Sequence, residues 1–230
     1  MSKELKNTQL NNEIIRLQNT PMIQYLFQEG ASPFSQPYYF LSFSTTKIST
    51  TELQSFIEFL RMIITHLEIL ETANTLIVFH SDDTFHFEPM MDTLKEDFGL
   101  PLKVFESGPL NPSRPEDFIT LWDAYTQFGL SNPRPYTNSI DLVYDIMSRD
   151  GAYLKQLRPI ILQGIEDDPQ MEVLIQSLFR NNLNITQTAE EVYMHRNTVM
   201  NKLNTIERRT GLHLQSFHNA VAIYLLMRAK

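Results

Sequence analysis

The feature that most constrains the fold is a change of residue pattern near residue 138. Before it, runs of aromatic and β-branched residues alternate with stretches in which apolar residues recur every three or four positions. After it, only the helical spacing continues. This pattern predicts an α+β protein, with an N-terminal mixed β-sheet domain backed by helices and then an all-α domain. A chain of 230 residues is long enough to give both parts a core.

Domain boundaries follow from the same pattern. We expect a polar segment at 1–20, an α/β domain at 21–132, a helical connector at 133–151 and an all-α domain at 152–230. The polar segment either forms a helix through Ile14, Ile15 and Leu17 or has no regular structure. In the α/β domain we predict strands at 38–43, 76–80, 85–87 and 102–105, and helices at 51–67, 89–98 and 115–128.

Charge is distributed unevenly along the chain. The net charge is −8, but residues 171–230 hold seven Lys/Arg and four Glu, which leaves +3 there and −11 in residues 1–170. An acidic body that carries a basic binding domain fits this asymmetry. The absence of cysteine excludes disulfides and Cys-based zinc sites. Because neither a signal peptide nor an apolar run of about 18 residues occurs, we expect no membrane association and a cytoplasmic location.

The most informative window is 185–206, which predicts two short helices joined by a tight turn. Thr186 is the expected N-cap of the first helix, in which Ala189 and Val192 face inward, and 193–195 form the turn. The second helix begins near Arg196. Its apolar side consists of Val199, Leu203 and Ile206.

The opposite side of the second helix is rich in amides. Arginine and asparagine are side chains that hydrogen-bond base edges in the major groove, whereas Thr186, Thr198 and Lys202 are placed to contact phosphates. Periodicity alone leaves open a helical hairpin whose polar face is merely solvated. The polar side comprises Arg196, Asn197, Met200, Asn201 and Asn204.

The identities of the residues in this region point to a particular family more specifically than their spacing does. Thr188-Ala189-Glu190-Glu191-Val192, His195-Arg196-Asn197-Thr198-Val199 and Thr210-Gly211-Leu212 resemble the C-terminal helix-turn-helix of the PucR/CdaR family of bacterial transcriptional regulators. The resemblance covers about 152–228, and the His-Arg-Asn-Thr core is also similar to the recognition helix of Fis-type activators. Tyr193 departs from generic helix-turn-helix units, which often have glycine at this place in the turn.

The resemblance implies that double-stranded DNA is the partner. The expected base contacts are His195, Arg196, Asn197 and Asn201; the expected phosphate contacts are Thr186, Thr198, Lys202 and Arg208. One short helix reads few bases, so we expect a homodimer on a palindromic site. An effector, either a small molecule or a protein, is a further partner that the resemblance allows but does not identify.

The N-terminal part loosely resembles the degenerate GGDEF-like domain of the same family, through its strand and helix order and Trp122-Asp123-Ala124-Tyr125. In this comparison Ser81-Asp82-Asp83-Thr84 would be the hairpin tip between two strands. It lacks the glycine pair that cyclases need, so we expect neither cyclase activity nor a Mg²⁺ site. His80 and His86 are expected on opposite faces of that hairpin, where they could not share an ion.

We therefore expect a regulator that is not an enzyme and that needs no cofactor or metal. No P-loop, Gly-x-Gly-x-x-Gly, nucleophile elbow or His-Glu-x-x-His motif occurs. Two alternatives remain. One is a helix-turn-helix retained as a protein-docking surface without DNA binding. The other is an α/β enzyme fused to a DNA-binding tail, which would require a deep polar pocket near Asp82 and Asp83.

Overall fold

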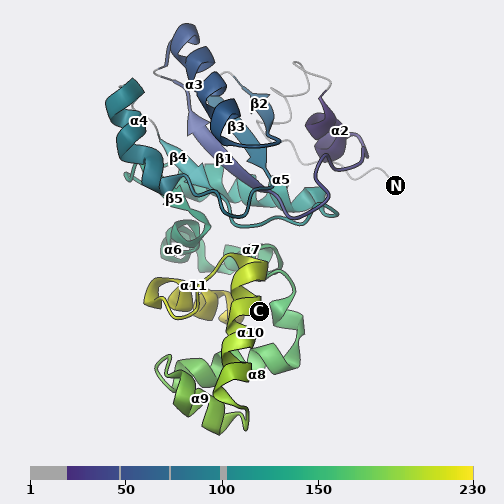
Figure 1. Cartoon of the computed structure of the whole chain (residues 1–230), viewed down its shortest axis with the longest axis vertical. Coiled ribbons are helices and arrows are strands. Elements are labelled where there is room, and N and C mark those ends of the chain that lie inside the picture. Colours follow the sequence, from purple (N-terminus) through teal and green to yellow (C-terminus); the bar gives the residue numbers. More distant parts are fainter. Residues whose placement is uncertain (1–19, 47, 73, 99–102, 230) are drawn as a thin grey trace. The chain divides into compact units, whose positions relative to one another are not determined.

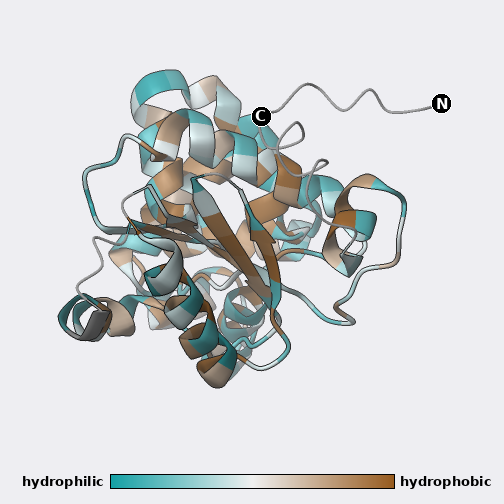
Figure 2. Cartoon of the chain, turned by 90° about the horizontal axis from the view of Figure 1, so that it is seen from above, coloured by the Kyte–Doolittle hydropathy of each residue, from teal (hydrophilic) through white to brown (hydrophobic). Residues whose placement is uncertain are grey.

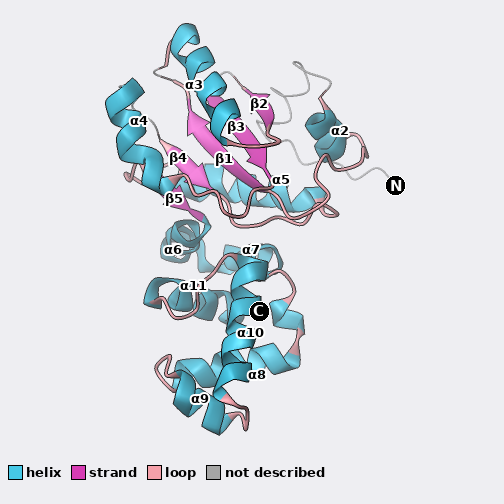
Figure 3. Cartoon of the chain, viewed as in Figure 1, coloured by secondary structure: helices cyan, strands magenta, loops and turns pink. Residues whose placement is uncertain are grey.

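The computed structural model describes residues 20–46, 48–72, 74–98 and 103–229 (Figure 1). The expected helix through Ile14, Ile15 and Leu17 lies outside these ranges. The chain divides into two compact units, Met1–Ser139 and Ile140–Lys230. The first contains a mixed sheet with helices and the second is helical (Figure 3), which confirms the predicted fold class.

A five-stranded sheet organises the described part of the first unit, in the order β2-β3-β1-β4-β5. Strand β1 is central and pairs antiparallel with β3 and β4, β2 pairs antiparallel with β3, and β5 pairs parallel with β4. The central strand reads Tyr-Phe-Leu-Ser-Phe-Ser because both of its faces are covered. The strands are β1 Tyr39–Ser44, β2 Glu68–Glu71, β3 Thr75–His80, β4 Val104–Glu106 and β5 Tyr136–Asn138.

Helices cover both faces of this sheet. Leu41 and Phe43 of β1 pack in a core with residues of α3 and α4. Phe40, on the opposite side of β1, contacts the rings of Phe118 and Trp122 in α5. Apolar residues concentrate along the strands, whereas the helices combine apolar and polar residues (Figure 2). The helices are α2 Pro21–Phe27, α3 Thr50–Ile63, α4 Met91–Phe98 and α5 Pro115–Ala124, which continues into a π-helical turn at Tyr125–Gly129.

The predicted hairpin with its tip at 81–84 is wrong. Strand β3 pairs with β2, which was not predicted, and 85–87 is not a strand. The alternation of Phe85-His86-Phe87 arises instead from a loop that turns its phenylalanines onto the sheet. Asp82 forms a local turn by accepting from the Thr84 backbone N–H at 2.9 Å.

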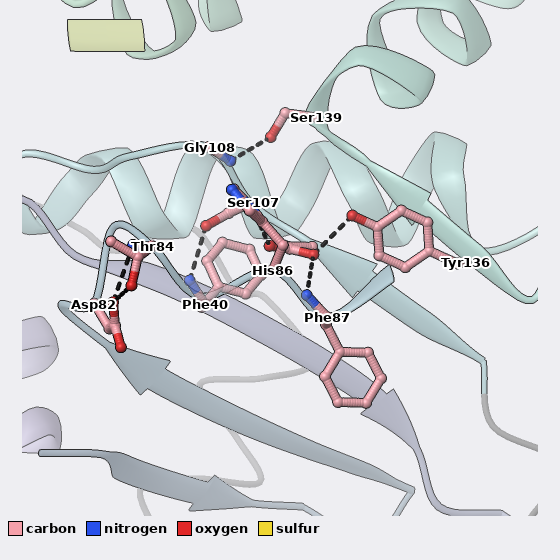
Figure 4. A network of polar contacts seen from close by, with 10 residues as sticks. Phe40, Asp82, Thr84, His86, Phe87, Ser107, Gly108, Tyr136 and Ser139 are labelled. Carbon is pink, nitrogen blue, oxygen red and sulfur yellow. Dashed lines mark hydrogen bonds and ion pairs between the residues drawn. The ribbon is translucent and has the colours of Figure 1, made fainter. Parts of the chain in front are cut away.

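The buried carboxylate of Glu106 holds that loop in place, and its partners His86, Phe87 and Tyr136 are labelled in Figure 4. Glu106 accepts from the backbone N–H of Phe87 at 3.2 Å and from the hydroxyl of Tyr136 at 2.7 Å. Its other oxygen lies 3.7 Å from Nδ1 of His86. Burial raises the pKa of the Glu106 carboxyl above its ordinary value, while these contacts oppose the rise. The backbone N–H of Phe87 therefore donates to the Glu106 side chain and not to the backbone of a neighbouring strand.

The two histidines are also placed differently from the prediction. His80 is fully buried and stacks on Tyr39, with ring centroids 5.4 Å apart, and its edge contacts Phe85. His86 is exposed and lies beside Glu106. Since no hairpin separates them, the geometric argument that put them on opposite faces does not hold. Burial lowers the pKa of His80 to about 4.

The second unit is a series of helices. The range predicted as a helical connector, 133–151, holds both strand β5 and helix α6. The sequence predicts a helix break at Pro159, because proline lacks the backbone N–H of the helical hydrogen bond, yet this residue lies inside α7. Among the described residues, no helix is both long and apolar enough to cross a bilayer. The helices are α6 Ser139–Asp150, α7 Leu154–Leu162, α8 Pro169–Arg180, α9 Ile185–Glu191, α10 Arg196–Thr210 and α11 Phe217–Arg228.

The last helix, α11, presents a different side to the core from the one that its sequence suggests. The sequence predicts that Phe217 and Tyr224 pack inward, yet their side chains are 78% and 48% exposed. Ala222, Ile223 and Leu226 are buried instead. Because α11 is apolar on nearly every side, the spacing of its residues does not single out one buried face.

Candidate nucleic-acid interface

Helices α9 and α10 form the predicted helix-turn-helix, but the first helix begins earlier than expected. Its N-cap is Asn184, whose Oδ1 accepts from the backbone N–H groups of Thr186 and Gln187 at 3.0 and 3.1 Å. Thr186 is therefore not the cap. It lies in the first turn with an exposed side chain, which leaves its predicted phosphate contact open.

The turn between the helices is a Schellman motif. The N–H of Met194 donates to the carbonyl of Ala189 at 2.9 Å, and that of Tyr193 donates to Glu190 at 3.3 Å. Tyr193 adopts a left-handed backbone with φ of 54°, and its side chain is 97% exposed. Glycine is favoured at this place because it adopts that conformation without strain. The turn itself is therefore of an ordinary type, and Tyr193 differs from the usual glycine only by being strained in it.

The packing between α9 and α10 follows the prediction. Ala189 is buried and lets the two helices approach closely. Val199, Leu203 and Ile206 form the buried side of α10 and are each at most 5% exposed. This arrangement fixes which side of α10 faces outward.

Polar side chains at the end of helix α8 contact the end of α9. The Arg180 guanidinium at its end forms an ion pair with Glu191 at the end of α9, and Nδ2 of Asn181 donates to the same carboxylate. The hydrogen bond from Arg180 is the main reason that the pKa of Glu191 lies below its ordinary value. These contacts join the ends of α8 and α9.

The expected base-contacting side chains lie on the outward side of α10. Arg196, Asn197 and Asn201 are all exposed. Within the part of the chain that the structure describes, no hydrogen bond or ion pair engages the Arg196 guanidinium or the Asn201 amide. His195 is also exposed, but its Nδ1 accepts from the backbone N–H of Asn197 at 3.2 Å and so caps α10.

The residues expected to contact phosphates differ in their exposure and in their local hydrogen bonds. Thr198 is exposed in the first turn of α10. Lys202 is half-buried, and its Nζ donates to Oε1 of Gln170 at 3.3 Å, while Arg208 reaches the hydroxyl of Thr205 at 3.4 Å. Both cations have only weak local partners. The sequence did not reveal Gln170, because it lies on α8, about thirty residues before Lys202.

Neighbouring Arg209 is anchored differently. Its guanidinium donates to the carbonyl oxygen of Gln163 at 2.6 Å. That bond joins the end of α10 to the end of α7, so Arg209 supports the fold of the domain. It is a poorer candidate for phosphate than Arg208.

The region around this helix-turn-helix matches a known family of domains. Residues 173–229 match the PucR C-terminal helix-turn-helix domain. A protein of Streptococcus dysgalactiae subsp. equisimilis named leucine-rich protein is 23% identical over 234 residues, covering 94% of this chain and 80% of that protein. The crystal structure of a regulator of polyketide synthase expression from Bifidobacterium adolescentis aligns with a TM-score of 0.43 and 13% identity, over 84% of this chain and 80% of that chain.

The second unit therefore contains a helix-turn-helix domain. More particularly, residues 173–229 are a PucR-type C-terminal helix-turn-helix domain. This supports a transcription regulator and indicates a regulatory rather than a catalytic module.

Proposed function

We propose that this chain regulates transcription by binding operator DNA in a sequence-specific manner, with α10 in the major groove. The observation that carries the proposal is the outward side of α10. Arg196, Asn197 and Asn201 are exposed there, while the opposite side of the helix is buried. Each bidentate contact of such a side chain with a base contributes about 1–3 kcal/mol of discrimination.

The phosphate contacts would position the helix. Thr186 and Thr198 offer exposed hydroxyls, and Lys202 and Arg208 can exchange their weak local hydrogen bonds for phosphate oxygens. The charge of +3 in residues 171–230 is small for one domain. A homodimer doubles that charge and presents two helices to a two-fold symmetric site. We also propose a bacterial, cytoplasmic setting, with the acidic first unit serving for dimerisation or for sensing a signal.

Selection of bound sequences from random DNA by the full chain tests the proposal. The selected DNA should bind in a salt-dependent manner. Arg196→Ala and Asn197→Ala should weaken the preference for the selected sequence over others, whereas Lys202→Ala should weaken all sequences alike. The matched control is Arg61→Ala, which removes an exposed arginine from α3 in the first unit.

Two results would contradict the proposal. One is the absence of salt-sensitive DNA binding by the folded chain, which would favour a protein-docking surface. The other is an equal loss of binding in the Arg61→Ala and Arg196→Ala variants, since that would reflect total charge rather than recognition by α10.

A further inference from the structure

The capping residue of α10 differs from those of other helices in this chain. Helices α3, α8 and α9 begin at Ser49, Asp168 and Asn184, each of which accepts backbone N–H groups through a side-chain oxygen. Helix α10 begins at His195, which accepts the N–H of Asn197 through a ring nitrogen. Serine, aspartate and asparagine are favoured N-caps, and histidine is not among them. The less usual residue therefore occurs on the helix that carries the proposed DNA contacts.

The capping bond selects one tautomer of the neutral ring. A nitrogen that accepts a hydrogen bond carries no proton, so the proton of the neutral His195 ring lies on Nε2. Nε2 is the ring nitrogen farther from the backbone. The residue is exposed, and within the described residues no hydrogen bond or ion pair engages Nε2. His195 thus presents one fixed hydrogen-bond donor next to Arg196.

We propose that His195 contributes to DNA binding by donating its Nε2–H to an acceptor on bound DNA, either a purine N7 or a phosphate oxygen. This inference rests on the proposed function. Every base pair exposes one purine N7 in the major groove, and phosphate oxygens line its edges. The amino groups of adenine and cytosine are excluded as partners, because the ring has no acceptor left to offer them. The His195 contact is therefore a donor contact only, unlike the amide contacts of Asn197 and Asn201.

Substitutions can separate the cap from the DNA contact. His195→Ser keeps a capping oxygen and removes the distant donor, whereas His195→Ala removes both. The Ser variant should keep the thermal stability of the wild type and lose about fivefold in affinity for the selected DNA. The Ala variant should lose stability as well. Asn184→Ser is the matched control, because it makes a similar cap exchange on α9 and should leave DNA affinity unchanged.

Modified DNA then distinguishes the two acceptors. Each purine of the selected site is replaced in turn by its 7-deaza analogue, and each phosphate in turn by a methylphosphonate. One 7-deaza position that weakens the wild type but not His195→Ser identifies a base contact. One methylphosphonate position that weakens binding by the wild type but not by His195→Ser identifies a phosphate contact.

Two results overturn the inference. His195→Ser could bind like the wild type, or it could bind weakly while keeping the full sensitivity of the wild type at every modified position. In either case the proposed function stands if Arg196→Ala still weakens the preference for the selected sequence. Absence of DNA binding by the wild-type chain would instead contradict the proposed function itself.

Discussion

The Arg180 guanidinium and the Glu191 carboxylate form an ion pair that joins the end of α8 to the end of α9. Asn181, the C-cap of α8, donates to the same carboxylate. The orientation of the helix-turn-helix therefore depends on a polar contact at its edge as well as on the buried side of α10.

Glu191→Ala should weaken DNA binding without removing any proposed DNA contact. The substitution removes the acceptor of Arg180 and Asn181 at the end of α8, so the polar contacts that fix α9 against that helix are lost. We expect a small decrease in the melting temperature by circular dichroism and a larger decrease in affinity for the selected DNA. The control is Glu190→Ala, which removes an exposed neighbouring carboxylate. An equal effect of both variants would show that only the loss of negative charge matters.

Tyr193→Gly should stabilise the protein. The left-handed backbone at φ of 54° strains any residue that has a Cβ atom, and the exposed ring contributes little burial in return. Removing the strain should raise the free energy of unfolding by about 1 kcal/mol, as measured with urea. Tyr193→Ala keeps the Cβ and should give no such gain. A comparable gain from both variants would assign the effect to the ring and contradict the strain argument.

Glu106→Ala should destabilise the first unit. It leaves the Phe87 N–H and the Tyr136 hydroxyl without their buried acceptor, at a cost of about 2–3 kcal/mol. Glu106→Gln keeps an acceptor oxygen and should cost much less. The fluorescence of Trp122, the single tryptophan of the chain, follows unfolding of this unit because its ring packs against Phe118. Equal losses in the two variants would exclude this role for the acceptor.

Asp117 and His80 should impose opposite pH dependences on the stability of the first unit. Burial raises the pKa of Asp117 to about 6, although its ion pair with Arg114 at 2.9 Å opposes the rise. Between about pH 4 and 6 the native state then holds a proton that the unfolded state has lost, so this residue lowers stability as pH rises. The pKa of His80, lowered to about 4, means that the unfolded state binds the extra proton between pH 4 and 6.5, so stability rises with pH.

Asp117→Asn separates these two effects. It removes the contribution that falls with pH, so stability should rise more steeply between pH 4 and 6 in the variant than in the wild type. Urea unfolding followed by Trp122 fluorescence at a series of pH values measures both slopes. Unchanged slopes would mean that Asp117 is ionised in the native state throughout this range.

Much of the second unit could be predicted because local residues specify it. The start of α10 at Arg196 and its buried side follow from helical spacing. Asp168-Pro169 combines a favoured N-cap with a proline at the first helical position, and α8 starts there. The cap of α9 was misplaced because Asn184 and Thr186 are both good capping residues, and only their backbone geometry distinguishes them. His195 was predicted as a base contact, while its capping role depends on a ring orientation that spacing does not specify.

The first unit was harder to predict because its structure depends on contacts between residues that are far apart in sequence. Phe85-His86-Phe87 has the alternation of a strand, but the partner of its backbone is the Glu106 side chain, nineteen residues beyond Phe87. Strand β2 is short and begins soon after a long helix, so the sequence pattern predicts neither a strand nor a helix for its residues. The sheet also extends to β5, beyond the expected end of the α/β domain at residue 132.

The most direct test of the central proposal is the affinity of the full chain for its selected DNA, measured over a range of salt concentrations, for the wild type and Arg196→Ala. We predict salt-dependent binding by both proteins, and in the variant a loss of preference for the selected sequence over unrelated DNA. Equal preference in the two proteins, or no binding by the folded wild type at low salt, would contradict recognition of DNA by α10.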